Sequence, residues 1–79
     1  MKTTIDRMAT GQSGRVSTLT GGIGLTRKLE SMGLRPGKKL KKVSSQVMRG
    51  PITVMVDGRQ LAMGRGIAAK VEVEIEQEA

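Results

Sequence analysis

The chain has 79 residues and a formal charge of +7, and it contains no cysteine, histidine or aromatic residue. A chain this short is expected to form one domain over residues 1–79 with one thin core, because it buries only about 60% of its unfolded surface. Without imidazole or thiol groups it lacks the usual zinc ligands, a cysteine nucleophile and a serine–histidine pair. We therefore expect no enzyme, no catalytic residue, no cofactor and no resident metal.

The positive charge is unevenly distributed along the chain. Residues 70–79 contain one lysine and four glutamates, whereas the first 69 residues carry a net charge of +10. A basic body could attract nucleic acid, anionic lipid or an acidic protein, or it could simply keep copies apart. Because no apolar run is long enough to cross a membrane, we expect a cytoplasmic protein that contacts a membrane only through a partner.

The first expected elements are a strand over residues 15–19 and a helix over about residues 25–32. One apolar stripe at spacing i, i+4 and i+7 defines the helix: Leu25, Leu29 and Met32. Gly33 is placed to end the helix in the left-handed conformation, with Leu34 as the apolar contact of that cap. Pro36 then prevents the helix from resuming.

A second strand is expected over residues 39–44, with an irregular pattern. Leu40 and Val43 are three residues apart and cannot lie on the same face of a regular strand, which predicts a bulge or an early end. Lysines in this segment would protect an edge strand from pairing with other sheets.

A hairpin follows, with Asp57 and Gly58 as its two-residue turn. The turn fixes the register of three pairs that share one apolar face: Val56 with Arg59, Val54 with Leu61, and Ile52 with Met63.

The last predicted elements are a helical turn over residues 67–69 and a final strand. The apolar residues of that strand alternate strictly with charged ones: Val71, Val73 and Ile75. Five short antiparallel strands and one short helix predict a mainly β fold, a small SH3-like barrel with the helix over one open end.

Two residue groups leave alternatives open. Five basic residues lie within residues 35–42, where they could bind phosphates or an acidic protein, or form a solvated turn and edge strand. One face of the last strand carries Glu72, Glu74 and Glu76. These glutamates could bind a hard cation, although balancing the charge of the basic body is the favoured interpretation.

A small basic barrel that binds nucleic acid is the alternative function, and the lack of aromatic rings for base stacking weakens it.

The methionines divide into two predicted groups. Met32 and Met63 are expected in the core, where methionine fills gaps left by the missing aromatic residues. Met55 points away from the apolar face of the hairpin and Met48 lies in a loop, so both are candidate contacts for a partner.

Three segments together resemble the FeoA family over nearly the whole chain. They are residues 14–22, residues 27–37 with the helix, its Met32-Gly33-Leu34 end and a Pro-Gly turn, and residues 50–64 with the alternating strand that follows. Lys42 departs from the resemblance, because the family usually has an aliphatic residue there.

The resemblance implies an SH3-like accessory protein of bacterial ferrous-iron transport that works with the membrane permease FeoB, which carries a cytoplasmic GTP-binding domain. FeoA-like domains also form the C-terminal domain of metal-dependent repressors. A chain that begins at Met1 and has no DNA-binding helix pair fits the free-standing form of the family. The expected docking surface is the helix and its exit turn, with four candidate contacts: Arg27, Lys28, Leu29 and Arg35. A regulator that senses metal or nucleotide is a weaker third hypothesis. The expected oligomeric state is either a monomer or a weak dimer.

Overall fold

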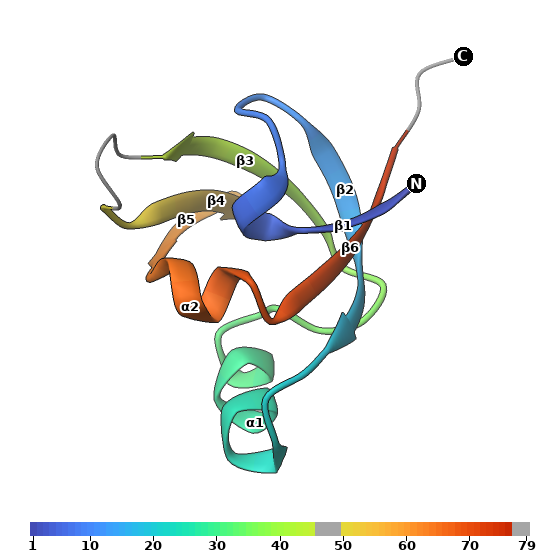
Figure 1. Ribbon diagram of the computed structural model, residues 1–79, viewed down its shortest axis with the longest axis vertical. Coiled ribbons are helices and arrows are strands. Elements are labelled where there is room, and N and C mark those ends of the chain that lie inside the picture. Colours follow the sequence, from blue (N-terminus) through green and yellow to red (C-terminus); the bar gives the residue numbers. More distant parts are fainter. Residues whose placement is uncertain (46–49, 77–79) are drawn as a thin grey trace.

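The computed structural model describes residues 1–45 and 50–76 and is dominated by one antiparallel sheet (Figure 1). The elements follow in the order β1 (Lys2–Thr4), the 3-10 turn η1 (Ile5–Arg7), β2 (Ser13–Leu19), α1 (Ile23–Ser31), β3 (Lys39–Ser45), β4 (Ile52–Val56), β5 (Arg59–Met63), α2 (Arg65–Ala68) and β6 (Val71–Ile75). The mainly β class, the helix and the short helical turn are confirmed, with α2 beginning two residues earlier than predicted.

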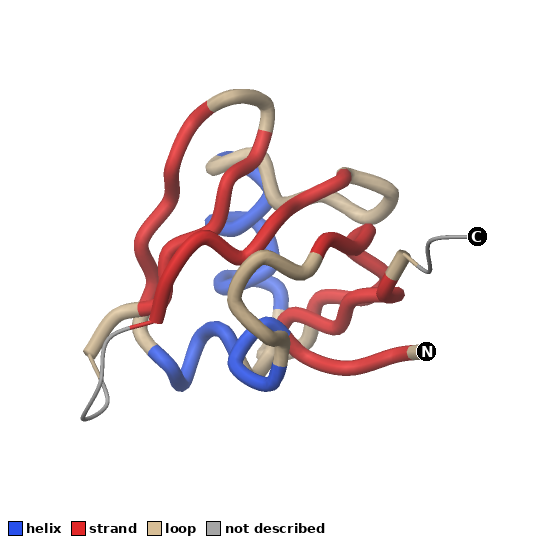
Figure 2. Tube along the Cα trace, turned by 90° about the horizontal axis from the view of Figure 1, so that it is seen from above, coloured by secondary structure: helices blue, strands red, loops and turns tan. Residues whose placement is uncertain are grey.

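The strands are arranged in the order β1-β6-β2-β3-β4-β5, and the sheet curves strongly (Figure 2), with α1 lying beyond one end of it (Figure 1). Because β1 and β5 at its two ends are not paired with each other in the described residues, the barrel is open. Segments η1 and α2 contact each other between these ends. The sequence predicted five strands, and the described residues form six. Strand β1 was missed because its sequence, Lys-Thr-Thr, has no alternation of apolar residues. Its extended conformation depends on pairing with β6.

The core lies inside the curved sheet and is entirely aliphatic and methionine. Its largest fully buried side chains come from η1, α1 and its exit, and three strands: Ile5, Leu29, Leu34, Leu40, Ile52, Val54, Val56, Val71 and Val73. Met63 is 5% exposed, which confirms its predicted core position, and Met8 is also buried. Met32 was predicted in the core and is only half-buried, because it caps the end of α1.

The predicted hairpin is present with its predicted register. Strands β4 and β5 pair Val56 with Arg59, Val54 with Leu61 and Ile52 with Met63. Asp57 and Gly58 have φ angles of 52° and 76°, the two positive values that such a two-residue turn requires.

Strand β3 contains the predicted irregularity, in the form of a bulge. Its register with β4 shifts between Lys42 and Ser44, so Val43 is the extra residue. However, β3 is bonded to β2 on one side and β4 on the other. The interpretation of this segment as an edge strand is therefore wrong.

The end of α1 follows the predicted cap. Gly33 has a φ of 99°, its N–H donates to Glu30 O at 3.0 Å, and the Leu34 N–H donates to Leu29 O at 3.0 Å. These two bonds satisfy carbonyls that the helix end leaves unpaired, and the buried Leu34 closes the motif. The chain leaves the helix in a fixed direction as a result, which positions the surface described next.

Candidate functional site

The outward face of α1 consists of five exposed residues: Ile23, Gly24, Arg27, Lys28 and Ser31. Ile23 is 68% exposed, which is unusual for a large apolar side chain in the described part of this chain. The opposite face anchors the helix through Leu29, which is 1% exposed. The helix thus separates a buried apolar anchor from an outward face that carries two cations and no carboxylate.

Arg35 adds a third cation where the chain leaves α1. Its Nε donates to Glu30 O at 3.3 Å, so the guanidinium lies at the carbonyl end of the helix, where the helix dipole favours a positive charge. Arg27 and Lys28 lie about one helical turn before the same end. The structure therefore brings three of the predicted contact residues together.

A fourth cation comes from β5 and was not predicted. A guanidinium nitrogen of Arg59 lies 3.4 Å from the position that a Cβ at Gly33 would occupy, so this side chain lies against the helix exit. The sequence separates Arg59 from α1 by a strand and a hairpin, and no local pattern signals this contact. We call Arg27, Lys28, Arg35 and Arg59 the α1 cationic surface.

The cations of the α1 cationic surface have no ion-pair partner among the described residues. The nearby carboxylate of Asp57 is already bound to Lys38 Nζ at 2.8 Å. That hydrogen bond, together with the charges of Lys38 and Arg59, lowers the pKa of Asp57. The acid therefore stays ionised and paired with Lys38.

The other three predicted contacts lie elsewhere. Leu29 is buried in the core, so it holds α1 in place and does not offer its side chain to a partner. Met55 is half-buried on the outward face of β4, between Lys41 and Gln60 of the neighbouring strands. Met48 lies outside the described residues.

The basic run over residues 35–42 does not form one patch. Lys38 pairs with Asp57 at 2.8 Å and Lys39 with Glu76 at 3.4 Å, while Lys41 is exposed on the sheet. Lys42 points into the protein. Because the strand alternates its side chains between two faces, these charges cannot follow one phosphate backbone together. This dispersal weighs against the nucleic-acid alternative.

Lys42 is 3% exposed, and within the described chain it is the buried charged side chain. Its Nζ donates to the carbonyl oxygens of Met8 at 2.6 Å and Asp6 at 3.3 Å. Burial lowers the pKa of Lys42, the charge of Arg65 lowers it further, and Asp6 acts in the opposite direction. Lys42 thus connects β3 to η1 and to Met8, the residue that follows η1.

The acidic row on β6 is paired within the molecule. Glu72 lies 3.9 Å from Lys2 Nζ, Glu74 lies 2.9 Å from the Met1 amino group, and Glu76 lies near Arg15 and Lys39. Among residues 1–45 and 50–76, no group of three or more potential ligands is gathered to hold a metal ion. The row therefore fits its favoured interpretation, which is charge balance.

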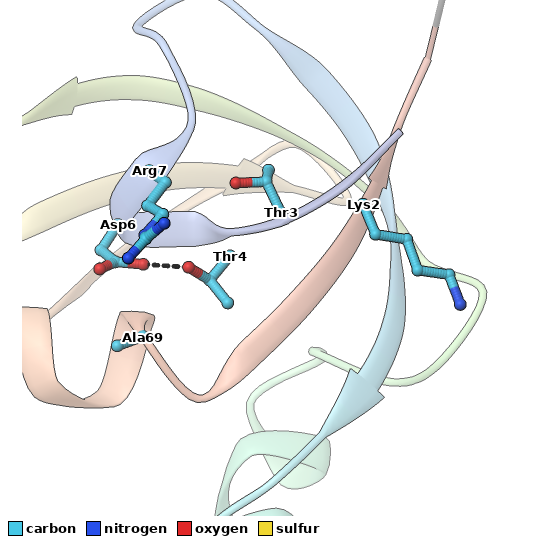
Figure 3. Close-up of a pocket in the computed structure, with 6 residues that line it drawn as sticks. All are labelled: Lys2, Thr3, Thr4, Asp6, Arg7 and Ala69. Atoms are coloured by element: carbon cyan, nitrogen blue, oxygen red, sulfur yellow. Dashed lines mark hydrogen bonds between the residues drawn. The ribbon is translucent and has the colours of Figure 1, made fainter.

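Two shallow pockets lie beside the sheet, one at its β1 edge and one near the start of β2. One of about 330 Å³ lies beside β1 and η1, where the Thr4 hydroxyl donates to the Asp6 carboxylate (Figure 3). In the same view Lys2 points away from Asp6, so the charged groups do not converge on one point. The other, of about 350 Å³, includes the already paired Lys39 and Glu76. Neither pocket gathers groups suited to catalysis.

The helices in the described part of the chain are too short to span a lipid bilayer.

Comparison with known proteins gives a consistent result. The model of a family described as the FeoA domain matches residues 3–75. An Fe(2+) transport protein A of Methanocaldococcus jannaschii is 38% identical over 64 residues, which cover 81% of this chain and 76% of that protein.

Solved structures agree on the fold. The crystal structure of an iron uptake regulatory protein, FeoA, superposes with a TM-score of 0.88 at 36% identity, covering 96% of this chain and 99% of that one. A manganese-dependent transcriptional repressor superposes with a TM-score of 0.86 at 18% identity, covering 95% of this chain but 42% of the repressor, a likeness of fold alone.

Proposed function

Because the chain belongs to the FeoA family, we propose that it is a cytoplasmic, non-catalytic accessory protein of a ferrous-iron transport system that binds the cytoplasmic region of a FeoB-type permease. The relatives named for iron(II) transport and iron uptake support the transport role. A chain without histidine, cysteine or a cluster of potential ligands among its described residues is better suited to contact another macromolecule than to carry iron itself.

The observation that carries the proposal is the α1 cationic surface. Its four cations have no ion-pair partner in the described chain, while Ile23 beside them is an exposed apolar group. An apolar residue within a rim of unpaired charge is a common composition for a protein interface. An acidic face on the permease would complement it and speed association.

The test is to measure binding to the full-length permease in lipid nanodiscs at low and at physiological salt. We expect the wild-type protein to bind, and the double variant Arg27→Gln with Lys28→Gln to bind about tenfold more weakly. The matched control, Lys2→Gln with Lys39→Gln, removes the same charge from residues that already have carboxylate partners and should bind like the wild type. Absence of wild-type binding in every nucleotide state of the permease would remove the proposal, and equal losses in both variants would move the contact away from α1.

A further inference from the structure

Strand β5 presents an unpaired edge. It ends the sheet, and in the described residues its neighbour is β4 alone. The two-residue turn makes Val56 and Arg59 a hydrogen-bonded pair, so the backbone groups of Gln60 and Ala62 point away from β4. Both residues are exposed. In the described chain, their backbone N–H and C=O groups make no hydrogen bond outside the pairing of β4 with β5.

The two edges of the sheet differ in how they are protected. Strand β1 has three residues, and its exposed Lys2 carries a charge there. Strand β5 has five residues in uninterrupted register, and its outward positions, Gln60 and Ala62, carry neither charge nor proline. Sheets usually blunt their edges with charge, proline, a bulge or short length. Apart from Arg59 at its start, β5 has none of these features, and an edge of such regular geometry is suited to accept another strand.

Charge indicates what kind of strand fits this edge. Neither β4 nor β5 contains a carboxylate. Arg59 stands at the start of β5 and belongs to the α1 cationic surface, so the edge continues that surface. A second copy of this chain would bring another net charge of +7, which opposes pairing of two β5 strands. An acidic segment meets no such repulsion.

From these observations we infer that β5 accepts an extended acidic segment of the permease by strand addition. The backbone of Gln60 and Ala62 pairs with the segment, and Arg59 faces a carboxylate at its end near α1. The inference rests on the proposed function, because it takes the permease as the protein that supplies the segment.

Amide hydrogen exchange of the full chain, with and without the full-length permease in nanodiscs, tests the pairing directly. In the complex the amides of Gln60 and Ala62 should exchange at least about tenfold more slowly. Leu61 and Met63 are internal controls, since their amides already face β4 and should change less.

Variants at Ala62 test the energetic role of the edge. Ala62→Pro removes an outward N–H at a position where edge strands accept proline, and should weaken permease binding about tenfold. Ala62→Ser keeps that N–H and should bind like the wild type. If the proline variant does not fold, Ala62→Glu replaces it, because a carboxylate there would repel an acidic segment and should also weaken binding.

The outcomes separate this inference from the proposed function. A complex in which Gln60 and Ala62 still exchange rapidly would overturn strand addition and leave the permease interaction standing. Failure of the wild type to bind would remove both. Protection that appears without the permease and grows with protein concentration would assign the edge to a second copy and overturn the inference.

Discussion

Two regions of this protein differ in whether their charged side chains form ion pairs. Around β6, four ion pairs join the glutamates to the Met1 amino group and to cations of β1, β2 and β3. Around α1, four cations share a surface without any pair in the described chain. The α1 cationic surface therefore gathers four positive charges that no carboxylate in the described chain neutralises, whereas the glutamates of β6 are balanced by neighbouring cations.

Sheet register explains the paired region. Glu74 lies opposite Lys2 on β1 and opposite Arg15 on β2, so cations flank the acidic strand on both sides. Cross-strand pairs of opposite charge stabilise a sheet, each by about 0.2–1 kcal/mol. The outward side of α1 is exposed, and within the described chain no strand covers it. The comparison teaches that internal pairing leaves α1, and not the acidic row, available for a partner.

The largest expected effect concerns the buried side of α1. Leu29→Ala should lower the free energy of unfolding by about 2–5 kcal/mol, because it opens a cavity under the helix. Ile23→Ala on the exposed side should change it by less than about 0.5 kcal/mol. Urea denaturation followed by far-UV circular dichroism measures both, since the chain has no aromatic fluorophore. Similar losses in the two variants would mean that the outward face of α1 is structural too.

The next effect concerns the packing of β2 on β6. A Cβ at Gly14 would lie 2.8 Å from the backbone oxygen of Glu74, so Gly14→Ala should destabilise the protein by about 1–3 kcal/mol. Gly24→Ala is the control, because a Cβ there meets nothing within 4 Å and alanine favours the helix by up to about 1 kcal/mol. Thermal unfolding by circular dichroism should therefore shift in opposite directions. A tolerated Gly14→Ala would show that the paired region is looser than its register implies.

A smaller effect concerns Lys42, a cation that faces carbonyl groups. Its folded-state pKa is lowered below 10.5, so unfolding takes up a proton, and the stability due to this group rises as pH increases toward 10.5. Lys42→Met should be within about 1 kcal/mol of the wild type near neutral pH, since the lost hydrogen bonds offset the removed burial cost of the charge. The difference between the two stability profiles should then grow in favour of the wild type at alkaline pH. A constant difference across pH would contradict the buried position of the ammonium group.

The smallest effect concerns the exposed ion pairs around β6. Lys2→Gln should change the free energy of unfolding by no more than about 0.5 kcal/mol, and the change should shrink further at high salt. Denaturation at two salt concentrations measures it. A change several times larger would show that the pairs act as a network and would sharpen the contrast with α1.

Local patterns in the sequence predicted the parts of the fold that depend on neighbours along the chain. The Asp57-Gly58 turn determined the β4–β5 register, and Gly33 with Leu34 determined the helix end. Strand β1 could not be found this way, because its strand conformation depends on pairing with β6 at the other end of the sequence.

The candidate surface was predicted in part for the same reason. Arg27, Lys28 and Arg35 lie on or next to one predictable helix, whereas Arg59 reaches it through the fold. Burial distinguished Leu29 from its exposed neighbours, and a stripe of apolar residues alone could not make that distinction. The two carbonyl partners of Lys42 come from a turn whose position only the folded chain defines.

The pairing of β1 with β6 also constrains when the molecule can be completed. Lys2 lies opposite Glu74, so β1 must wait for more than seventy further residues to be synthesised before its neighbour exists. Until then the inner strand β6 is missing from between β1 and β2, and the apolar residues of β2 and η1 lack their cover. Such long-range closure slows folding. Acquisition of the native state is therefore expected to be a late event during biosynthesis, after β6 has been synthesised.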